Sequence, residues 1–378
     1  MAVVEHPFHP IIYVRGYAMT QGEIDATVAT PYMGFNLGAT KVRQDWRGKA
    51  RRHIFESPLV RLMKDYRYTD TFADGSERGD ALPARSIVIY RYYEPADSDL
   101  GGGAEPPSIR EAASGLGDLI LRVRRQVCGD DAEALAGFRV YLVAHSMGGL
   151  ICRCFLQNPD VGTAEAKSIV DKVFTYATPH NGIEMAGVNV PGFVGLFDIN
   201  NFNRGYMRDY LALPAGAERV DSLNDRFDAD RFFCLVGTNH KDYTVAASLS
   251  RRFAGEMSDG LVKIENAAVR GAPRSFVYRS HSGDYGIVNS EEGYQNLTRF
   301  LFGDLRVNGT LEVEQLPLPP SVRKAHEQGR DIKASYYFES TVTPRGAEVE
   351  ADERGPFIPL SSPKGFKGRL RLEYSDWS

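Results

Sequence analysis

The chain of 378 residues contains little cysteine and little net charge, and both absences exclude classes of protein. Its four cysteines are too few and too scattered for a disulfide scaffold, and none belongs to a CxxC or HxxxH zinc pattern. We therefore expect reduced, mostly buried thiols at Cys128, Cys152, Cys154 and Cys234. The formal net charge of −4, from 45 Lys+Arg and 49 Asp+Glu, lacks the basic excess of nucleic-acid-binding proteins.

Long apolar runs and a secretory signal are also missing. No run approaches the roughly 20 apolar residues that cross a bilayer. Residues 1–10 contain two His, two Pro and a Glu, which is unlike a signal peptide. We expect no transmembrane segment and a cytoplasmic location, with signal-independent secretion as the alternative. The hydrophobic fraction of 43% is ordinary for a globular protein.

Apolar runs typical of strands alternate with helical patterns along the first 303 residues. Strands are expected at 11–14, 86–90, 138–144, 170–176, 232–237 and 275–279. One helix is expected to begin at Ser108, which forms a capping-box pattern with Glu111, a second to cover 148–157, and a third to follow Ser290 and end before Gly303. This alternation predicts an α/β fold with a mostly parallel sheet and helices on both faces.

The sequence changes character after Gly303. Residues 304–378 contain alternating apolar and polar positions and clustered prolines, which predict a small antiparallel β-rich module. We therefore divide the chain into a domain of residues 1–303 and a module of residues 304–378. The module could bind a partner or a surface, or act as a stabilising flank, and its sequence gives no site.

The segment from Tyr141 to Leu150 is the most informative part of the chain. A buried strand runs into Ser146, and a glycine-rich helix start follows at once. This is the context of a nucleophile elbow, a strained turn that needs small residues two places before and after the serine. Ala144 and Gly148 meet that need, and the N–H of Met147 at the helix start is suited to hold an oxyanion.

Three segments resemble the α/β-hydrolase superfamily, in particular its lipase-like branch. Residues 144–149 (Ala-His-Ser-Met-Gly-Gly) resemble the lipase form of the elbow, with alanine in place of the usual first glycine. Residues 176–182 (Tyr-Ala-Thr-Pro-His-Asn-Gly) resemble the segment after the next strand in many bacterial lipases. Residues 258–262 (Ser-Asp-Gly-Leu-Val) resemble the loop that carries the acid. The resemblance covers about residues 8–303 and implies a triad in the order serine, acid, histidine.

The position of His281 makes it the preferred base. It lies after the last predicted strand and before the last helix, in a loop that contains Ser282, Gly283 and Asp284. His180 and His240 follow other strands and are the alternatives. His145 lies next to the nucleophile in sequence and is expected to point away from it.

Asp259 is the preferred acid because it follows the strand at 232–237, precedes His281 and lies in the Asp-Gly-Leu-Val context. It would orient the imidazole and stabilise its positive form. Asp242, nearer the end of the same strand, is the main rival. Asp284 is too close to His281 along the chain to orient it.

The loop after the first strand is expected to supply the second oxyanion donor. Gly16 permits the backbone to turn inward, and by position the N–H of Tyr17 would pair with that of Met147. Relatives usually carry histidine before this glycine, whereas this chain has Arg15. Arg15 forms either a surface salt bridge or a contact near a substrate carboxylate or phosphate.

Residues 183–230 form an insertion rich in apolar side chains between two predicted strands. In the fold implied by the resemblance, such an insertion covers the active site as a lid or cap, and an apolar lid suggests an apolar acyl group. The alternative is that these side chains complete the core.

Together these features predict a lipase- or esterase-like serine hydrolase that uses Ser146, His281 and Asp259, with no metal and no organic cofactor. The partner would be a small-molecule or lipid ester, and nucleic acid is excluded. A phospholipase, thioesterase, amidase or acyltransferase with the same triad is the first alternative. A non-catalytic binding protein on a hydrolase scaffold is the second.

Overall fold

A computed structural model describes most of the chain: residues 6–16, 39–44, 50–55, 57–71, 81–96, 105–185, 188–189, 199–243, 255, 257–282, 285–318, 320–330, 353–354, 358–361 and 366–376. The chain divides into two compact units, Met1–Leu301 and Phe302–Ser378.

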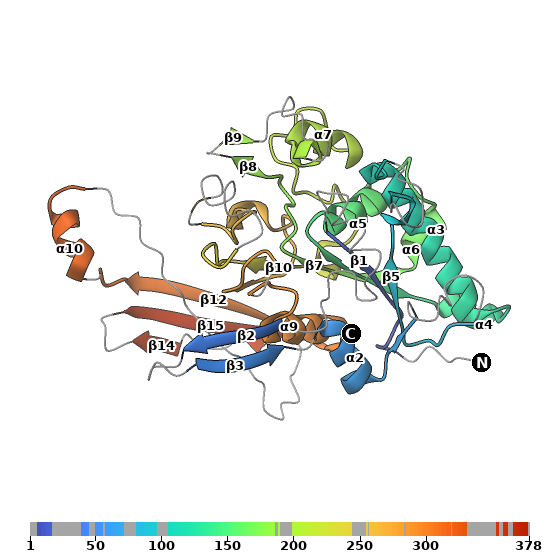
Figure 1. The fold of residues 1–378 in the computed structure, drawn as a ribbon, viewed down its shortest axis with the longest axis horizontal. Coiled ribbons are helices and arrows are strands. Elements are labelled where there is room, and N and C mark those ends of the chain that lie inside the picture. The colour runs from blue at the N-terminus through green and yellow to red at the C-terminus, as the bar shows by residue number, and fades with distance from the viewer. Residues whose placement is uncertain are drawn as a thin grey trace. The chain divides into compact units, whose positions relative to one another are not determined.

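The first unit is built on a seven-stranded sheet in the order β11-β10-β7-β6-β1-β5-β4, and every pair of neighbours is parallel (Figure 1). The strands are β1 (Ile11–Val14), β4 (Thr69–Asp70), β5 (Ser86–Tyr90), β6 (Val140–His145), β7 (Val170–Tyr176), β10 (Phe232–Gly237) and β11 (Arg274–Val277). The α/β prediction with a mostly parallel sheet is therefore confirmed. Strand β4, at one edge, was not expected, because two residues give no alternating pattern to detect.

Helices α3 (Ile109–Cys128) and α5 (Met147–Gln157) pack against one face of this sheet and build the main core. Helix α3 begins at the capping box of Ser108 and Glu111, as the sequence predicts, and its apolar side faces α5. Two shorter helices follow them in the sequence: α4 (Ala132–Gly137) comes after α3, and α6 (Ala164–Ser168) comes after α5. Helix α5 is buried along its whole length, which fixes the segment directly after Ser146.

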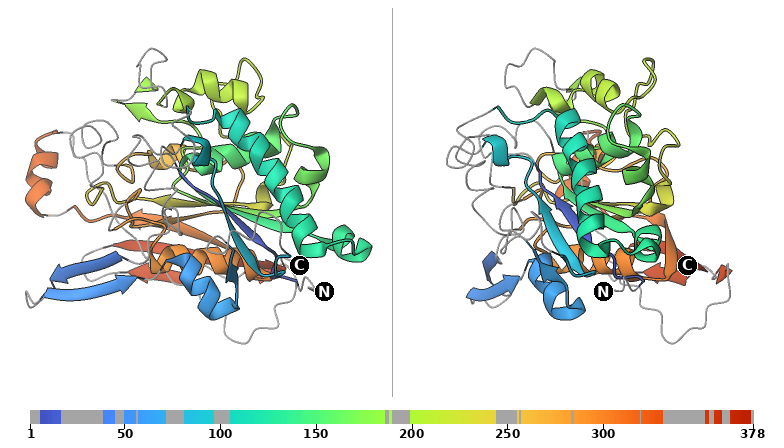
Figure 2. Two further views of the ribbon diagram at one scale, coloured as in Figure 1. Left: turned by 45° about the vertical axis from the view of Figure 1, so that its right-hand side comes forward. Right: turned by 90° about the vertical axis from the view of Figure 1, so that its right-hand side faces the viewer.

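Helices α2 (Pro58–Tyr66) and α9 (Glu291–Phe302) lie on the opposite side of the sheet from α3 and α5 (Figures 1 and 2). The ammonium group of Lys172 on β7 donates to the carbonyl oxygens of Phe300 and Leu301, at 3.1 and 3.2 Å. A cation at this position satisfies carbonyl groups that the end of helix α9 leaves without helical partners. The prediction of helices on both faces is thus confirmed.

Several shorter elements complete the described part of this unit. Strands β2 (Ala39–Gln44) and β3 (Ala50–Phe55) form one antiparallel pair, and β8 (Glu184–Met185) and β9 (Val188–Asn189) form another. Helix α7 covers Arg204–Tyr210, and 3-10 turns cover Glu94–Ala96, Ile199–Phe202, Ala229–Arg231 and Ile264–Asn266.

The described part of the insertion from 199 to 230 packs into the main core rather than standing apart from it. Its buried apolar side chains are Phe202, Met207, Tyr210, Leu211, Val220 and Leu223. This agrees with the interpretation that the insertion completes the core. Most of the apolar stretch from 186 to 198 lies outside the described residues, so the lid stays a prediction.

The second unit is an antiparallel β module, in agreement with the predicted fold class. Strand β12 (Leu305–Gln315) pairs with β15 (Lys367–Asp376), and β15 also pairs with β13 (Glu353–Arg354) and β14 (Ile358–Ser361). Helix α10 covers Pro320–Glu327. Binding of a partner or a surface by this module stays a prediction.

All four cysteines are buried and unpaired, as expected from the sequence. Burial raises the pKa of the Cys152 and Cys154 thiols, so these groups are protonated at neutral pH. Among the described residues, no helix is both long and apolar enough to span a bilayer.

Candidate active site

Ser146 occupies a strained turn between β6 and α5. Its φ of 52° and ψ of −126° lie where few residues with a side chain are found. Two hydrogen bonds hold the backbone of Ser146 in this conformation. Its N–H donates to Tyr176 O at 2.9 Å, and its carbonyl oxygen accepts from Thr178 Oγ1 at 2.9 Å. This is the strand–turn–helix geometry of a nucleophile elbow.

The small residues around Ser146 are required by close backbone contacts. A Cβ on Gly148 would collide with the carbonyl oxygen of Val14 and would lie 2.6 Å from the carbonyl oxygen of Arg15. Ala144, at the other small position, is fully buried in β6. The spacing noticed in the sequence therefore has a steric cause: helix α5 begins directly over the end of β1.

Of the two expected oxyanion donors, the structure describes one. Met147 is buried and is the first residue of α5, where backbone N–H groups have no partner within the helix. The positive end of the helix adds to the attraction for a negative oxygen. Tyr17 lies outside the described residues, and its role stays a prediction.

Ser146, His281 and Asp259 form one hydrogen-bonded chain. His281 Nε2 lies 3.0 Å from Ser146 Oγ, and His281 Nδ1 lies 2.9 Å from Asp259 Oδ2. All three are buried, with exposed fractions of 5% for Ser146, 3% for His281 and 1% for Asp259. Such a chain of buried groups allows the imidazole to accept the serine proton while the carboxylate stabilises the resulting charge.

The Asp-Gly-Leu-Val loop holds Asp259 through main-chain groups. Asp259 Oδ1 accepts hydrogen bonds from the N–H groups of Leu261 at 3.0 Å and Val262 at 2.8 Å. The carbonyl oxygen of Asp259 accepts the N–H of His281 at 2.9 Å, and Tyr243 packs its ring edge-on against His281. One oxygen of the carboxylate is therefore fixed by the loop, which aims the other at the imidazole.

The rival residues have other partners. Asp242 Oδ2 accepts a hydrogen bond from Asn239 Nδ2 at 2.7 Å. His180 is fully buried, its Nε2 lies 3.1 Å from Thr175 Oγ1, and burial next to the Arg153 charge lowers its pKa well below 6.5. His240 has no hydrogen bond to Ser146 among the described residues, and Asp284 lies outside them.

His145 has a contact that the sequence did not suggest. Its Nε2 lies 3.0 Å from the carbonyl oxygen of His281, and the two rings are 5.0 Å apart between centroids. Burial, assisted by the charges of His281 and Arg15, lowers the pKa of His145 to about 3. The imidazole is therefore neutral at physiological pH and donates its one N–H to the backbone of His281.

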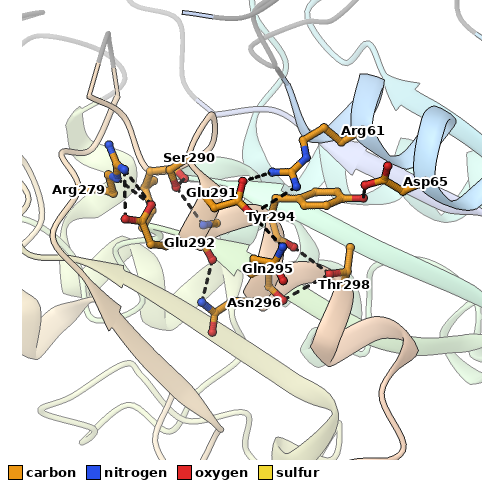
Figure 3. Close-up of polar contacts among 12 residues, drawn as sticks. Arg61, Asp65, Arg279, Ser290, Glu291, Glu292, Tyr294, Gln295, Asn296 and Thr298 are labelled. Carbon is orange, nitrogen blue, oxygen red and sulfur yellow. Dashed lines mark hydrogen bonds and ion pairs between the residues drawn. The ribbon is translucent and has the colours of Figure 1, made fainter. Parts of the chain in front are cut away.

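The loop that carries His281 is also fastened at both ends. Arg279, two residues before His281, forms a two-point ion pair with Glu292 on α9, with N–O distances of 3.0 and 3.1 Å (Figure 3). Ser290 caps the same helix, since its Oγ accepts the N–H of Gly293 at 2.9 Å. The stretch between β11 and α9 is thus closed by contacts across its base.

Helix α9 is joined in turn to α2. Arg61 donates to Glu291 at 2.5 Å and lies over the ring of Tyr294, 3.6 Å from its centroid (Figure 3). The hydroxyl of Tyr294 donates to Asp65 Oδ2 at 2.7 Å. These contacts fix α9 at a point beyond the His281 loop.

Among the residues that the structure describes, Arg153 on α5 is the largest fully buried side chain. Its guanidinium donates to the carbonyl oxygens of His180, Val220 and Ser222 at 2.7–2.8 Å and to Gln157 Oε1 at 2.8 Å. Burial lowers its pKa to about 10, which leaves it charged at neutral pH. Arg153 therefore fastens α5, the helix after Ser146, to the loop after β7 and to the insertion.

The all-parallel order of the central sheet, the strained turn at Ser146 and the helices on both faces are those of an α/β-hydrolase fold. Ser146, Asp259 and His281 follow one another along the chain in the order of that superfamily.

No protein-family model matches the chain, and no curated protein matches it. Among solved structures, a gene product of Listeria innocua is 12% identical, covers 78% of this chain and 93% of its own, and has a TM-score of 0.34. Phospholipase PlaB from Legionella pneumophila is 12% identical, with coverages of 98% and 81% and a TM-score of 0.35. A cutinase-like protein from Cryptococcus sp. is 14% identical, with coverages of 53% and 72% and a TM-score of 0.23. Likeness this remote does not define a substrate for the present chain.

Proposed function

We propose that this protein is a serine hydrolase that cleaves carboxylic esters through an acyl-enzyme. The observation that carries the proposal is the hydrogen-bonded chain from Ser146 Oγ through His281 to Asp259, with heavy-atom distances of 3.0 and 2.9 Å. A serine on a strained elbow, touching a histidine that touches a buried carboxylate, is the arrangement that activates a hydroxyl for attack.

In the proposed reaction Ser146 Oγ attacks the ester carbonyl as His281 Nε2 takes its proton. Collapse of the tetrahedral intermediate expels the alcohol, which receives that proton from His281, and leaves the acyl group on Ser146. A water molecule then attacks the acyl-enzyme and gives a proton to His281. Collapse of the second intermediate breaks the bond to Ser146 Oγ, which takes that proton back from His281, and the acid is released. Asp259 keeps Nδ1 of His281 protonated and stabilises the imidazolium in both halves.

The negative oxygen of each intermediate would be held by backbone donors. Met147 N–H at the start of α5 is one candidate, supported by its place in the elbow. Tyr17 N–H is the other, supported by its sequence position after Gly16. The proposed substrates are esters of apolar acyl groups, because the insertion near residues 188–197 is rich in apolar side chains.

The direct test is hydrolysis of p-nitrophenyl esters by the wild-type protein and by Ser146→Ala. We expect the wild type to turn over these esters and the variant to lose at least about a thousandfold in kcat. The variant should keep its thermal midpoint, since only one oxygen atom is removed. Ester hydrolysis by a folded Ser146→Ala variant would contradict the assignment of Ser146 as the nucleophile. A series from acetyl to decanoyl esters tests the acyl preference, and a preference for acetyl would contradict it.

A further inference from the structure

Arg15 lies beside His145, the residue before the proposed nucleophile. Strands β1 and β6 are parallel, and Val14 pairs with Ala144. Continuing this register by one and two residues places Arg15 next to His145 and Gly16 next to Ser146. The close approach of the two loops agrees, since a Cβ on Gly16 would lie 2.9 Å from that of Ser146 and 3.0 Å from His145 Nδ1.

The backbone at Arg15 is held in place. The hydroxyl of Tyr92, which is 4% exposed, lies 2.9 Å from the carbonyl oxygen of Arg15 and 3.0 Å from that of Gly16. Both carbonyl groups therefore point toward Tyr92. Because these contacts fix the main chain, the Cα atom from which the Arg15 side chain extends has a defined position at the edge of the site.

The guanidinium of Arg15 has no partner among the described residues. Its Nη1 is buried without an acceptor, and no ion pair joins Arg15 to a described carboxylate. By contrast, the guanidinium of Arg153 donates to carbonyl oxygens, and that of Arg279 donates to the carboxylate of Glu292. A buried N–H with no acceptor costs free energy, and the cost is larger for a charged group. The positive charge of Arg15 also acts on its neighbour His145, where it adds to the effect of burial in lowering the pKa.

We propose that Arg15 binds a phosphate or carboxylate group carried by the alcohol portion of the ester substrate, an inference that rests on the proposed ester hydrolysis. The planar fork of a guanidinium matches either oxyanion with two parallel hydrogen bonds. The acyl group proposed above is apolar, so the negative charge belongs to the alcohol. An anion at this point would supply the acceptor that Nη1 lacks.

Three octanoyl esters test the inference: 1-octanoylglycerol, 1-octanoylglycerol 3-phosphate and the octanoyl ester of glyceric acid, each below its aggregation limit. They share the acyl group and differ in the charge on the alcohol. The quantity of interest is the ratio of kcat/KM for each charged ester to kcat/KM for the neutral one. We expect Arg15→Gln to lower this ratio about 10- to 100-fold, the range for a charge-assisted hydrogen bond. Comparison of the phosphate and glycerate esters shows which oxyanion is preferred.

Arg125→Gln is the matched control, because it removes the same charge from an exposed side chain whose hydrogen bond is to its own helix. It should leave the ratio within twofold. An equal fall for all three esters in Arg15→Gln would show a merely structural role for Arg15 and overturn the inference, as would an unchanged ratio. If Arg15→Gln does not fold, Arg15→Lys replaces it, since lysine keeps the charge but loses the fork. A ratio lowered at least about threefold in Arg15→Lys supports the inference, and an unchanged ratio overturns it.

The two proposals fail in different ways. If the wild type hydrolyses none of the three esters and reacts with no serine-directed probe, the proposed function fails. If it hydrolyses the esters but substitution of Arg15 leaves the ratio of charged to neutral kcat/KM unchanged, only the present inference fails.

Discussion

The Nε2 atom of His145 lies 3.0 Å from the carbonyl oxygen of His281, whose own Nε2 lies 3.0 Å from Ser146 Oγ. The residue before the proposed nucleophile thus contacts the backbone of the proposed base. Since His145 is neutral, this contact is a hydrogen bond between uncharged groups that helps to hold the His281 loop near the serine.

Replacing His145 by phenylalanine should weaken this arrangement. The carbonyl oxygen of His281 would lose its donor, and we expect kcat for p-nitrophenyl butyrate to fall about tenfold and the free energy of unfolding to fall by about 1–3 kcal/mol. His145→Gln, which keeps an N–H donor, should lose less of both. Wild-type kcat in His145→Phe would contradict this role.

The ion pair between Arg279 and Glu292 should matter for turnover more than for stability. Glu292→Gln removes the charge without changing the size of the side chain, so the loop with His281 should be less well ordered. We expect kcat to fall about three- to tenfold, while the free energy of unfolding changes by less than about 1 kcal/mol because the pair is partly exposed.

Glu291→Gln is the control for that experiment. It removes the neighbouring charge on α9, which pairs with Arg61 rather than with the His281 loop. Turnover within twofold of wild type is expected. Equal losses in the two variants would indicate a general effect of helix α9 rather than an effect of the loop.

Gly148 should tolerate no side chain. Gly148→Ala would drive Cβ into the carbonyl oxygens of Val14 and Arg15, so we expect a loss of at least about 3 kcal/mol in the free energy of unfolding or failure to fold. Gly137→Ala is the matched substitution, because a Cβ there meets nothing within 4 Å among the described atoms. Urea unfolding should show a change within about 0.5 kcal/mol for Gly137→Ala. A similar stability for both variants would contradict the steric account of the elbow.

His180 should make the protein less stable in acid. Burial and the charge of Arg153 lower its pKa well below 6.5, so the folded protein keeps it neutral while the unfolded chain binds a proton as the pH falls below about 6.5. Its contribution to stability is therefore present above that pH and is lost on acidification. From pH 7 to 5 the loss is about 2 kcal/mol for one such histidine.

His180→Gln removes this titration and keeps a polar group for Thr175. Its free energy of unfolding should be lower than that of the wild type at pH 7, yet should fall less between pH 7 and 5. Burial also lowers the pKa of His9 to about 4. Its effect on the pH dependence of stability is the same in both proteins and cancels in the comparison. The same pH dependence in both proteins would show that His180 is not held neutral.

The elbow could be recognised from the sequence because its requirements are local. Ala144, Ser146 and Gly148 lie within five residues, and the apolar runs on either side define the strand and the helix. His281 and Asp259 could be placed because each follows a recognisable strand in the order that the resemblance implies. The structure brings both to Ser146, and the loop hydrogen bonds to Asp259 explain the Asp-Gly-Leu-Val pattern.

Contacts between distant parts of the chain could not be predicted. His145 and His281 are 136 positions apart, and nothing in either neighbourhood indicates that a backbone carbonyl lies opposite the ring. The main-chain acceptors of Arg153 come from two separate loops. One signal was present, since Arg153 is the only charged residue between Met147 and Gln157, which suggests a buried role. The order of strands in the sheet likewise depends on pairings that a single sequence does not specify.

The central claim, that Ser146 is an activated nucleophile, is tested most directly by a fluorophosphonate probe and peptide mass spectrometry. The probe forms a covalent bond only with a serine whose hydroxyl is activated by a neighbouring base. We expect one adduct, on Ser146, which is absent in Ser146→Ala and forms at least about a hundredfold more slowly in His281→Gln. A folded wild-type protein that forms no adduct, or forms it on another residue, would show that Ser146 is not an activated nucleophile.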